Sequence, residues 1–266
     1  MSSIIEVLAA VGISAEEELL FEPIVSHASE WQGFSEVKSP ADYYEAVQCY
    51  MRTVALSFAD RGVKLTSLDG VMISPFAEIG EGTVIYPNVQ IRHGVKIGKN
   101  CVIGSGSIIE NSTIGDDCVI HATQIYQSVL DDNVRIGPFC HVRPNSHLCA
   151  GVKIGDFVEV KNSTVGKDTH ASHLTYIGDS DVGERVNFGC GTVTVNYDGR
   201  KKARTVIGND VFIGCNTNLI APVHIGDNGY TAAGSTITDD VPENALAIAR
   251  ARQINKDGWV TKRKQK

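Results

Sequence analysis

Two histidines and a tyrosine lie within the ten-residue segment His170-Ala-Ser-His-Leu-Thr-Tyr-Ile-Gly-Asp179. Imidazole has a pKa near neutral and suits proton transfer, while a phenol can donate or accept a hydrogen bond. Segment 187–192 follows, and segment 196–205 after it is polar and basic. We expect these segments to bring a set of polar side chains together on one side wall of the molecule: His173, Tyr176, Asn187, Asn196, Tyr197 and Lys202.

A six-residue period organises the chain around these segments. Isoleucine recurs at every sixth position from Ile73 to Ile109, and a residue such as Ala77 or Cys101 stands two positions earlier. The period returns at 114, 136–160 and 207–225, often with Gly after the aliphatic residue. This pattern is the hexapeptide repeat of a parallel β-helix, in which the aliphatic side chain points inward, the small residue fits the inner turn and Gly permits the corner. Cys101, Cys118 and Cys140 fall on the inner-turn position and are expected to pack there.

Three six-residue units close one coil, so residues 71–240 predict roughly nine coils in a column about 40 Å tall. Departures from the period occur at 121–135, 168–178 and 196–205. A β-helix accepts insertions where the chain loops outward from a corner, and such loops commonly carry function. We therefore expect all three segments to leave the regular column.

Helical signals precede the repeat. Ser39 before Pro40, with an acid three residues after Ser39, predicts an N-cap and a helix over about 40–60 that Gly62 ends. Its apolar face would consist of Tyr43, Ala46, Val47, Tyr50, Val54 and Phe58. Two shorter helices are expected at 4–10 and 15–20. The predicted organisation is an α-helical region (1–70), a β-helix domain (71–245) and a C-terminal arm with a basic tail (246–266).

Composition narrows the class of protein. The net charge of −7 argues against broad nucleic-acid binding, although the tail is basic. The seven cysteines contain no Cys-x-x-Cys pair, which disfavours a disulfide framework or a zinc ribbon. No apolar run approaches the roughly 20 residues of a membrane span, and the start lacks the basic region of a signal peptide. We expect a cytoplasmic protein that binds neither membrane nor nucleic acid.

Six motifs between residues 143 and 250 carry a family resemblance. They are Arg143-Pro144, Phe157-Val-Glu-Val-Lys161, Ser172-His-Leu-Thr-Tyr-Ile-Gly-Asp179, Asn187-Phe-Gly, Asn196-Tyr-Asp-Gly199 and Glu243-Asn-Ala-Leu-Ala-Ile-Ala-Arg250. Through them the chain resembles the acetyltransferase domain of the bacterial bifunctional N-acetylglucosamine-1-phosphate uridyltransferase/glucosamine-1-phosphate acetyltransferase. The resemblance covers about two thirds of the chain and implies an all-β, left-handed parallel β-helix and a homotrimer. The family's uridyltransferase domain has no counterpart in residues 1–70, so we expect no uridyl transfer and consider a separate uridyltransferase a candidate partner.

The resemblance also implies residue roles. His173 would be the general base for attack of a sugar amine on acetyl-CoA, the co-substrate, with no metal required. The family's sugar-phosphate contacts match Arg143, Lys161, Tyr176 and Asn187, to which Lys202 adds. The coenzyme A contacts match Cys190, Asn196, Tyr197, Cys215, Ala233 and Arg250. Cys190 and Cys215 depart from the family's usual Ala and Ser, which puts full cofactor affinity in question at Cys215.

Three functions remain open at this stage. The first is N-acetylation of glucosamine 1-phosphate, which feeds UDP-N-acetylglucosamine and cell-wall peptidoglycan synthesis. The second is the same chemistry on another amino sugar or nucleotide sugar, and the third is a non-catalytic scaffold or regulator. A carbonic-anhydrase-like zinc site, known on the same fold, is disfavoured because no set of histidines is spaced for it; His141 and His147 lie on different faces of one coil.

Overall fold

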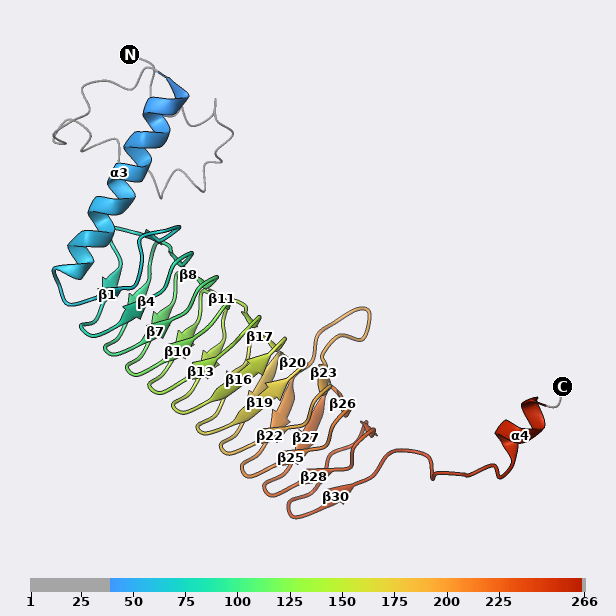
Figure 1. Ribbon diagram of the computed structural model, residues 1–266. Coiled ribbons are helices and arrows are strands. Elements are labelled where there is room, and N and C mark those ends of the chain that lie inside the picture. The colour runs from blue at the N-terminus through green and yellow to red at the C-terminus, as the bar shows by residue number, and fades with distance from the viewer. Residues whose placement is uncertain (1–38, 265–266) are drawn as a thin grey trace.

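The computed structural model describes residues 39–264 as one column of parallel strands, with a helix at its N-terminal end and an extended arm at the other (Figure 1). The chain passes through three parallel sheets in turn, and the fold is the left-handed parallel β-helix that the resemblance implies. The helices expected at 4–10 and 15–20, and the last two residues of the basic tail, lie outside the described residues.

Each coil contributes one short strand to each sheet, and strands of one sheet pair in parallel with their neighbours above and below. Sheet A contains β1 (Lys64–Leu65), β4 (Val84–Ile85), β7 (Val102–Ile103), β10 (Val119–Ile120), β13 (Arg135–Ile136), β16 (Lys153–Asp156), β19 (His170–His173), β22 (Asn187–Phe188), β25 (Phe212–Ile213), β28 (Tyr230–Thr231) and β30 (Leu246–Ala247). Sheet B contains β2 (Met72–Ile73), β5 (Gln90–Ile91), β8 (Ile108–Glu110), β11 (Gln124–Tyr126), β14 (His141–Val142), β17 (Glu159–Lys161), β20 (Tyr176–Gly178), β23 (Val193–Val195), β26 (Asn218–Ile220) and β29 (Thr236–Ile237). Sheet C contains β3 (Glu78–Ile79), β6 (Lys96–Ile97), β9 (Thr113–Ile114), β12 (Val129–Leu130), β15 (His147–Leu148), β18 (Thr164–Val165), β21 (Ser180–Val182), β24 (Thr205–Ile207) and β27 (Val223–Ile225).

The core is the stack of inward-facing aliphatic side chains. Ile85, Ile103 and Ile120 pair in register along sheet A and are fully buried. The inner-turn residues Cys101 and Cys118 are also fully buried, so the prediction that these cysteines pack inside is confirmed. Ten strands in sheet B and eleven in sheet A exceed the roughly nine coils expected, because strands form as early as residue 64 and as late as residue 247.

Helix α3 (Pro40–Ala59) closes the N-terminal end of the column (Figure 1). The Ser39 side chain accepts a hydrogen bond from the Asp42 backbone N–H, which confirms the predicted N-cap. Val47, Val54 and Phe58 are buried and belong to the same hydrophobic core as the first coils. An amphipathic helix thereby shields the apolar end of the β-helix from water.

Two of the three expected outward loops do not exist. Lys153 pairs with His170 and His170 pairs with Asn187, so the coils through residues 168–178 stay in the column with a spacing of 17 residues. Residues 121–135 likewise contain β11 and β12, and Val119 pairs with Arg135 after only 16 residues. The prediction was wrong because these irregularities are short corners, not insertions.

The third segment does leave the column. Asn187 pairs with Phe212, a spacing of 25 residues, and the excess lies between β23 and β24 (Figure 1). Tyr197 and Lys202 form an antiparallel bridge within it, and the Asp198 carboxylate accepts from the backbone N–H groups of Arg200 and Lys201. The insertion is therefore an ordered hairpin.

The corners between strands form vertical rows of residues with left-handed backbone. At the corner between sheets B and C the row consists of Asn111, Gln127, Asn145, Asn162 and Asp179, with φ between 44° and 62°. Asn and Asp tolerate this conformation better than most residues, because their short polar side chains bond locally. The row positions Asp179 directly below Asn162 in the next coil.

The C-terminal arm follows β30 and ends in the short helix α4 (Trp259–Lys264), which the sequence did not predict. The Arg263 guanidinium lies 5.1 Å from the centre of the Trp259 ring, a cation–π contact. No helix within residues 39–264 is long and apolar enough to cross a lipid bilayer.

Candidate active site

A buried carboxylate organises one cluster of polar side chains at the corner between sheets B and C. Asp179 is only 4% exposed, and its Oδ1 accepts a 2.5 Å hydrogen bond from Asn162 Nδ2. Lys161 Nζ lies 3.2 Å from Asp179 Oδ2, and Asn196 Nδ2 also donates to that oxygen. Three donors from the two neighbouring coils thus satisfy one carboxylate, and the carboxylate in turn fixes their positions.

The hairpin inserted after β23 delivers two members of this cluster. Asn196 stands at its base, where its carbonyl accepts from the Ala203 N–H at 2.9 Å. Lys202 lies on the returning strand, close enough to Lys161 for the two amines to interact. Arg204 then anchors the end of the hairpin, since its Nε donates to Asp181 Oδ2 at 2.9 Å.

Tyr176 joins the cluster from β20. Its hydroxyl accepts a hydrogen bond from Asn196 Nδ2 at 3.3 Å. The ring lies over Gly178, two residues further along the strand, where an added Cβ would stand 2.3 Å from the phenolic oxygen. Glycine is therefore required at 178 for the tyrosine to reach the hairpin.

Arg143 stands three coils above Asn196 and is held by Glu159. The Arg143 Nη1 to Glu159 Oε1 distance is 2.8 Å, and both side chains remain partly exposed. The hydrogen bond to Glu159 raises the pKa of the Arg143 guanidinium further. Arg143, Lys161 and Lys202 place three basic groups on this side of the column.

The pKa values of the charged residues in this cluster shift in different directions. Burial opposes ionisation of Asp179, but the hydrogen bonds from Asn162, Lys161 and Asn196 outweigh it and hold the pKa of the carboxyl below its ordinary value. The adjacent Lys202 amine, and then Asp179, raise the pKa of Lys161. Lys161 in turn lowers the pKa of the exposed Lys202. The two lysines cannot both be charged without mutual repulsion, and Asp179 stabilises the charge on Lys161.

His173 stands at a different corner, between sheets A and B, at the end of β19. Its side chain is exposed, and its imidazole has no hydrogen bond among the described residues. The Thr175 hydroxyl donates to the His173 carbonyl at 2.7 Å and fixes the corner backbone. The ring is thus accessible for proton exchange with a bound molecule.

The predicted coenzyme A residues form a row below His173 at the same corner. Backbone hydrogen bonds link Leu174 to Gly191, Cys190 to Asn216 and Cys215 to Gly234 in successive coils. Ala233 precedes Gly234, and the Arg250 Cδ lies 3.9 Å from the position of a Cβ added at Gly234. Cys190 is half-buried and the rest of this row is exposed: Cys215, Ala233 and Arg250.

The structure therefore divides the predicted site residues into two groups. Arg143, Lys161, Tyr176, Asn196 and Lys202 gather along sheet B and its corner with sheet C. His173, Cys190, Cys215, Ala233 and Arg250 line the corner between sheets A and B. Asn187 lies apart on sheet A, paired with His170 and Phe212, and Tyr197 is exposed on the hairpin. Tyr176 begins the strand that connects the two corners.

Sequence reasoning did not assign roles to Asp179, Asn162 or Glu159, which hold the basic side chains in place. All three lie in or beside the motifs that carry the resemblance. A signal for Asp179 existed, since it occupies the corner position at which Asn recurs, and an acid there near Lys161 indicates a charged partner.

The fold and the repeat define the class of this protein. Residues 76–111 and 204–239 match the model of the bacterial transferase hexapeptide (six repeats). The structure is similar to that of an Arabidopsis UDP-N-acetylglucosamine acyltransferase, with a TM-score of 0.57 and 19% identity over 71% of this chain and 70% of that one, a likeness of fold. By class the chain is a hexapeptide-repeat protein with the parallel β-helix fold.

The branch within this class follows from closer matches. Residues 104–195 match the GlmU-like, C-terminal hexapeptide family. The bifunctional protein GlmU of Caldicellulosiruptor saccharolyticus is 60% identical over 77% of this chain and 44% of its own length. The bifunctional protein GlmU of Clostridium kluyveri is 48% identical over 85% of this chain and 50% of its own length. The chain belongs to the GlmU-like hexapeptide family, and it spans about half the length of these relatives.

Proposed function

We propose that this protein transfers the acetyl group of acetyl-CoA to the amine of glucosamine 1-phosphate. The observation that carries this proposal is the basic cluster built around Asp179. Lys161 Nζ lies 3.2 Å from Asp179 Oδ2, the inserted hairpin adds Lys202, and Arg143 is held nearby by Glu159. Such an arrangement favours an anionic ligand, and a sugar phosphate would neutralise it.

In the proposed reaction His173 acts as general base. Its imidazole takes a proton from the sugar amine as the nitrogen attacks the thioester carbonyl, the new C–N bond forms, and the C–S bond breaks to release coenzyme A. A positioned base typically contributes about 10² to 10⁴ in rate. The backbone N–H of Cys190, which makes no hydrogen bond within residues 39–264, is the candidate donor to the oxyanion.

The remaining residues position the two substrates. We assign Arg143, Lys161, Lys202, Tyr176 and Asn187 to the sugar phosphate. The row Cys190, Cys215, Ala233 and Arg250 would bind coenzyme A, with Asn196 and Tyr197 contributing from the hairpin. Because the two groups lie at different corners of one column, we propose a homotrimer in which one subunit's arm completes its neighbour's site. A cytoplasmic location and a separate uridyltransferase partner belong to the same proposal.

The experiment that tests this function is incubation of the pure protein with acetyl-CoA and glucosamine 1-phosphate, with mass spectrometry of the sugar. The free thiols would confuse an assay of coenzyme A release. Acetylated sugar supports the proposal. If acetyl-CoA binds but no product forms, the acceptor is another amino sugar and not glucosamine 1-phosphate. If acetyl-CoA does not bind and no product forms, the protein is a non-catalytic scaffold. Sedimentation showing a fully active monomer would refute the shared site.

A further inference from the structure

One position in sheet C carries glycine in nearly every coil. It is the residue directly after the inward-facing aliphatic side chain, occupied by Gly80, Gly98, Gly115, Gly166, Gly183, Gly208 and Gly226. A Cβ added at Gly166 would lie 2.3 Å from the Gly183 carbonyl oxygen, so the coil below leaves little room for a side chain. Among the described coils with a sheet C strand, only Asp131 and Cys149 depart from the rule, and they are in consecutive coils.

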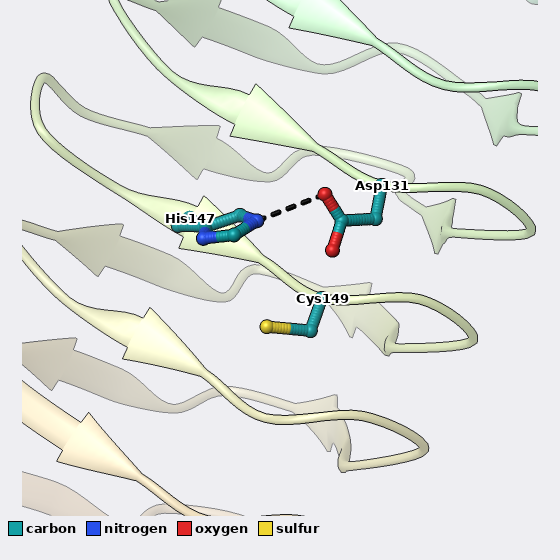
Figure 2. A group of neighbouring side chains, drawn as sticks. All are labelled: Asp131, His147 and Cys149. Atoms are coloured by element: carbon teal, nitrogen blue, oxygen red, sulfur yellow. Dashed lines mark hydrogen bonds and ion pairs between the residues drawn. The ribbon is translucent and has the colours of Figure 1, made fainter.

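Asp131 and Cys149 lie beside a histidine, His147, on the same face of sheet C. Val129 pairs with His147 and Leu130 with Leu148, so Asp131 stands directly above Cys149. Side chains alternate along a strand, and His147 and Cys149 therefore project on the same outer side of β15 while Leu148 points into the core. Figure 2 shows the carboxylate, the imidazole and the thiol turned toward a common space on the surface of sheet C.

The distances suit shared coordination. His147 Nε2 lies 2.9 Å from Asp131 Oδ1, and the ligand atoms of all three residues lie within 4.8 Å of one another. Ligands of a tetrahedral zinc ion, at bond lengths of about 2.0 to 2.3 Å, stand about 3.3 to 3.7 Å apart. All three side chains are half-buried, which leaves them room to adjust by a rotation.

We propose that Asp131, His147 and Cys149 form a binding site for a divalent transition-metal ion of the zinc type. Thiolate, imidazole and carboxylate together match the ligand preference of Zn²⁺ and Co²⁺ and exclude Mg²⁺ and Ca²⁺, which prefer oxygen ligands alone. Water completes the fourth position, since the site is open to solvent. The site lies on sheet C, away from the cluster around Asp179 and from the row below His173.

The surrounding charge favours a cation. The Asp131 carboxylate stands over Cys149 from the neighbouring coil, and its oxygen lies within 4.8 Å of the sulfur and of the imidazole nitrogen. A bound divalent ion links these two consecutive coils of the β-helix at a corner where glycine is otherwise the rule.

The test uses Co²⁺ alone as the probe, added to the full chain under reducing conditions. A tetrahedral site with a thiolate ligand gives an intense sulfur-to-cobalt absorption band and visible d–d bands, which added Zn²⁺ removes. The proposal predicts one tight equivalent per chain. Cys149→Ser should abolish the sulfur band, and His147→Gln and Asp131→Asn should each weaken binding at least about 10-fold, the lower end of the loss found even for residues that only orient a ligand.

Cys49→Ser is the matched control, because Cys49 is an exposed thiol on α3 far along the chain from the site. It should leave the band and the affinity unchanged. A band that survives Cys149→Ser, or one that disappears with Cys49→Ser, would overturn the assignment. Absence of any cobalt band in the unaltered protein would also overturn it and would leave His147 and Asp131 as a hydrogen-bonded pair on the surface.

Discussion

Asp179→Asn is the substitution that most directly tests how the polar cluster is built. Asparagine has nearly the same shape and already occupies the equivalent corner positions at Asn145 and Asn162, so the backbone at φ 49° accepts it. What changes is the charge. Lys161 loses its ion-pair partner, and the substituted amide leaves Asn162 or Asn196 facing an N–H in place of an acceptor oxygen.

The magnitude follows from burial. A hydrogen bond to a charged group contributes about 1.5 to 3 kcal/mol, and breaking a fully buried ion pair costs about 3 to 5 kcal/mol. The Lys161 side chain keeps 18% exposure and so regains part of its hydration. We expect a loss of about 2 to 3 kcal/mol, which lowers Tm by about 4 to 12 °C for a chain of this size.

The pH dependence of stability tests whether the charge of Asp179 is responsible. The pKa of Asp179 is lowered from 3.8 in the folded protein, so its stabilising effect is complete above that value and is lost as pH falls through the folded pKa. The difference in free energy of unfolding between the original protein and Asp179→Asn should be constant from neutral pH to about 5 and should shrink below about pH 4. Urea unfolding at several pH values measures it.

Asp168→Asn is the matched control. Asp168 has the same left-handed backbone, with φ 55°, but is exposed and makes no side-chain hydrogen bond or ion pair among the described residues. Its replacement should change stability by less than about 0.5 kcal/mol. Equal stability of Asp179→Asn and the original protein at neutral pH, or a difference that persists undiminished at acid pH, would refute the reasoning.

Three further predictions concern the proposed activity and the column. His173→Ala should lower turnover by about 10² to 10⁴ without changing the sedimentation coefficient, since the exposed imidazole contributes no packing; full turnover would exclude it as the base. Lys161→Met should raise KM for the sugar phosphate at least about 10-fold and leave KM for acetyl-CoA unchanged. Steady-state kinetics with each substrate varied in turn measures the two constants, and equal increases in both would contradict the assignment. Gly155→Ala should destabilise the protein by about 1 to 3 kcal/mol, because the added Cβ would lie 2.0 Å from the Ser172 carbonyl oxygen. At Gly199 an added Cβ meets no atom within 4 Å, so Gly199→Ala should cost only about 1 kcal/mol for its φ of 94°. Thermal unfolding that finds Gly199→Ala the less stable of the two variants would contradict this.

The column could be predicted from the sequence because its rule is local. Every sixth residue must fill the same interior, so the isoleucines from Ile73 to Ile109 reveal the period without any knowledge of contacts. The N-cap at Ser39 is equally local and is confirmed. Coil length is different, because a corner can lose one or two residues while its strands keep their register, as they do before His170 and Arg135. A break in the six-residue period therefore does not distinguish a shortened corner from an outward loop.

The composition of the insertion distinguishes the two cases. Segment 196–205 contains Asp198 and Gly199, which form a tight turn, and Arg204, which bonds to Asp181 and closes the hairpin. Segment 168–178 has no such turn residues beyond the ordinary corner. Reading turn chemistry together with the period would have predicted one insertion in place of three.

Contacts between coils could not be predicted from the period alone. Asp179, Asn162 and Asn196 belong to three coils and meet only because the register of sheets B and C stacks them, with the hairpin adding Asn196 and Lys202 from the side. The corner backbone restricts residue type at each of these positions without fixing its charge. A single choice of Asp in a row of Asn and Gln converts a structural row into the support for a basic cluster. The same logic applies on sheet C, where two residues that replace glycine in consecutive coils bring a carboxylate and a thiol to one histidine. In a β-helix, departures from a row's usual residue type are thus the positions at which a function-specific group can be added without changing the fold.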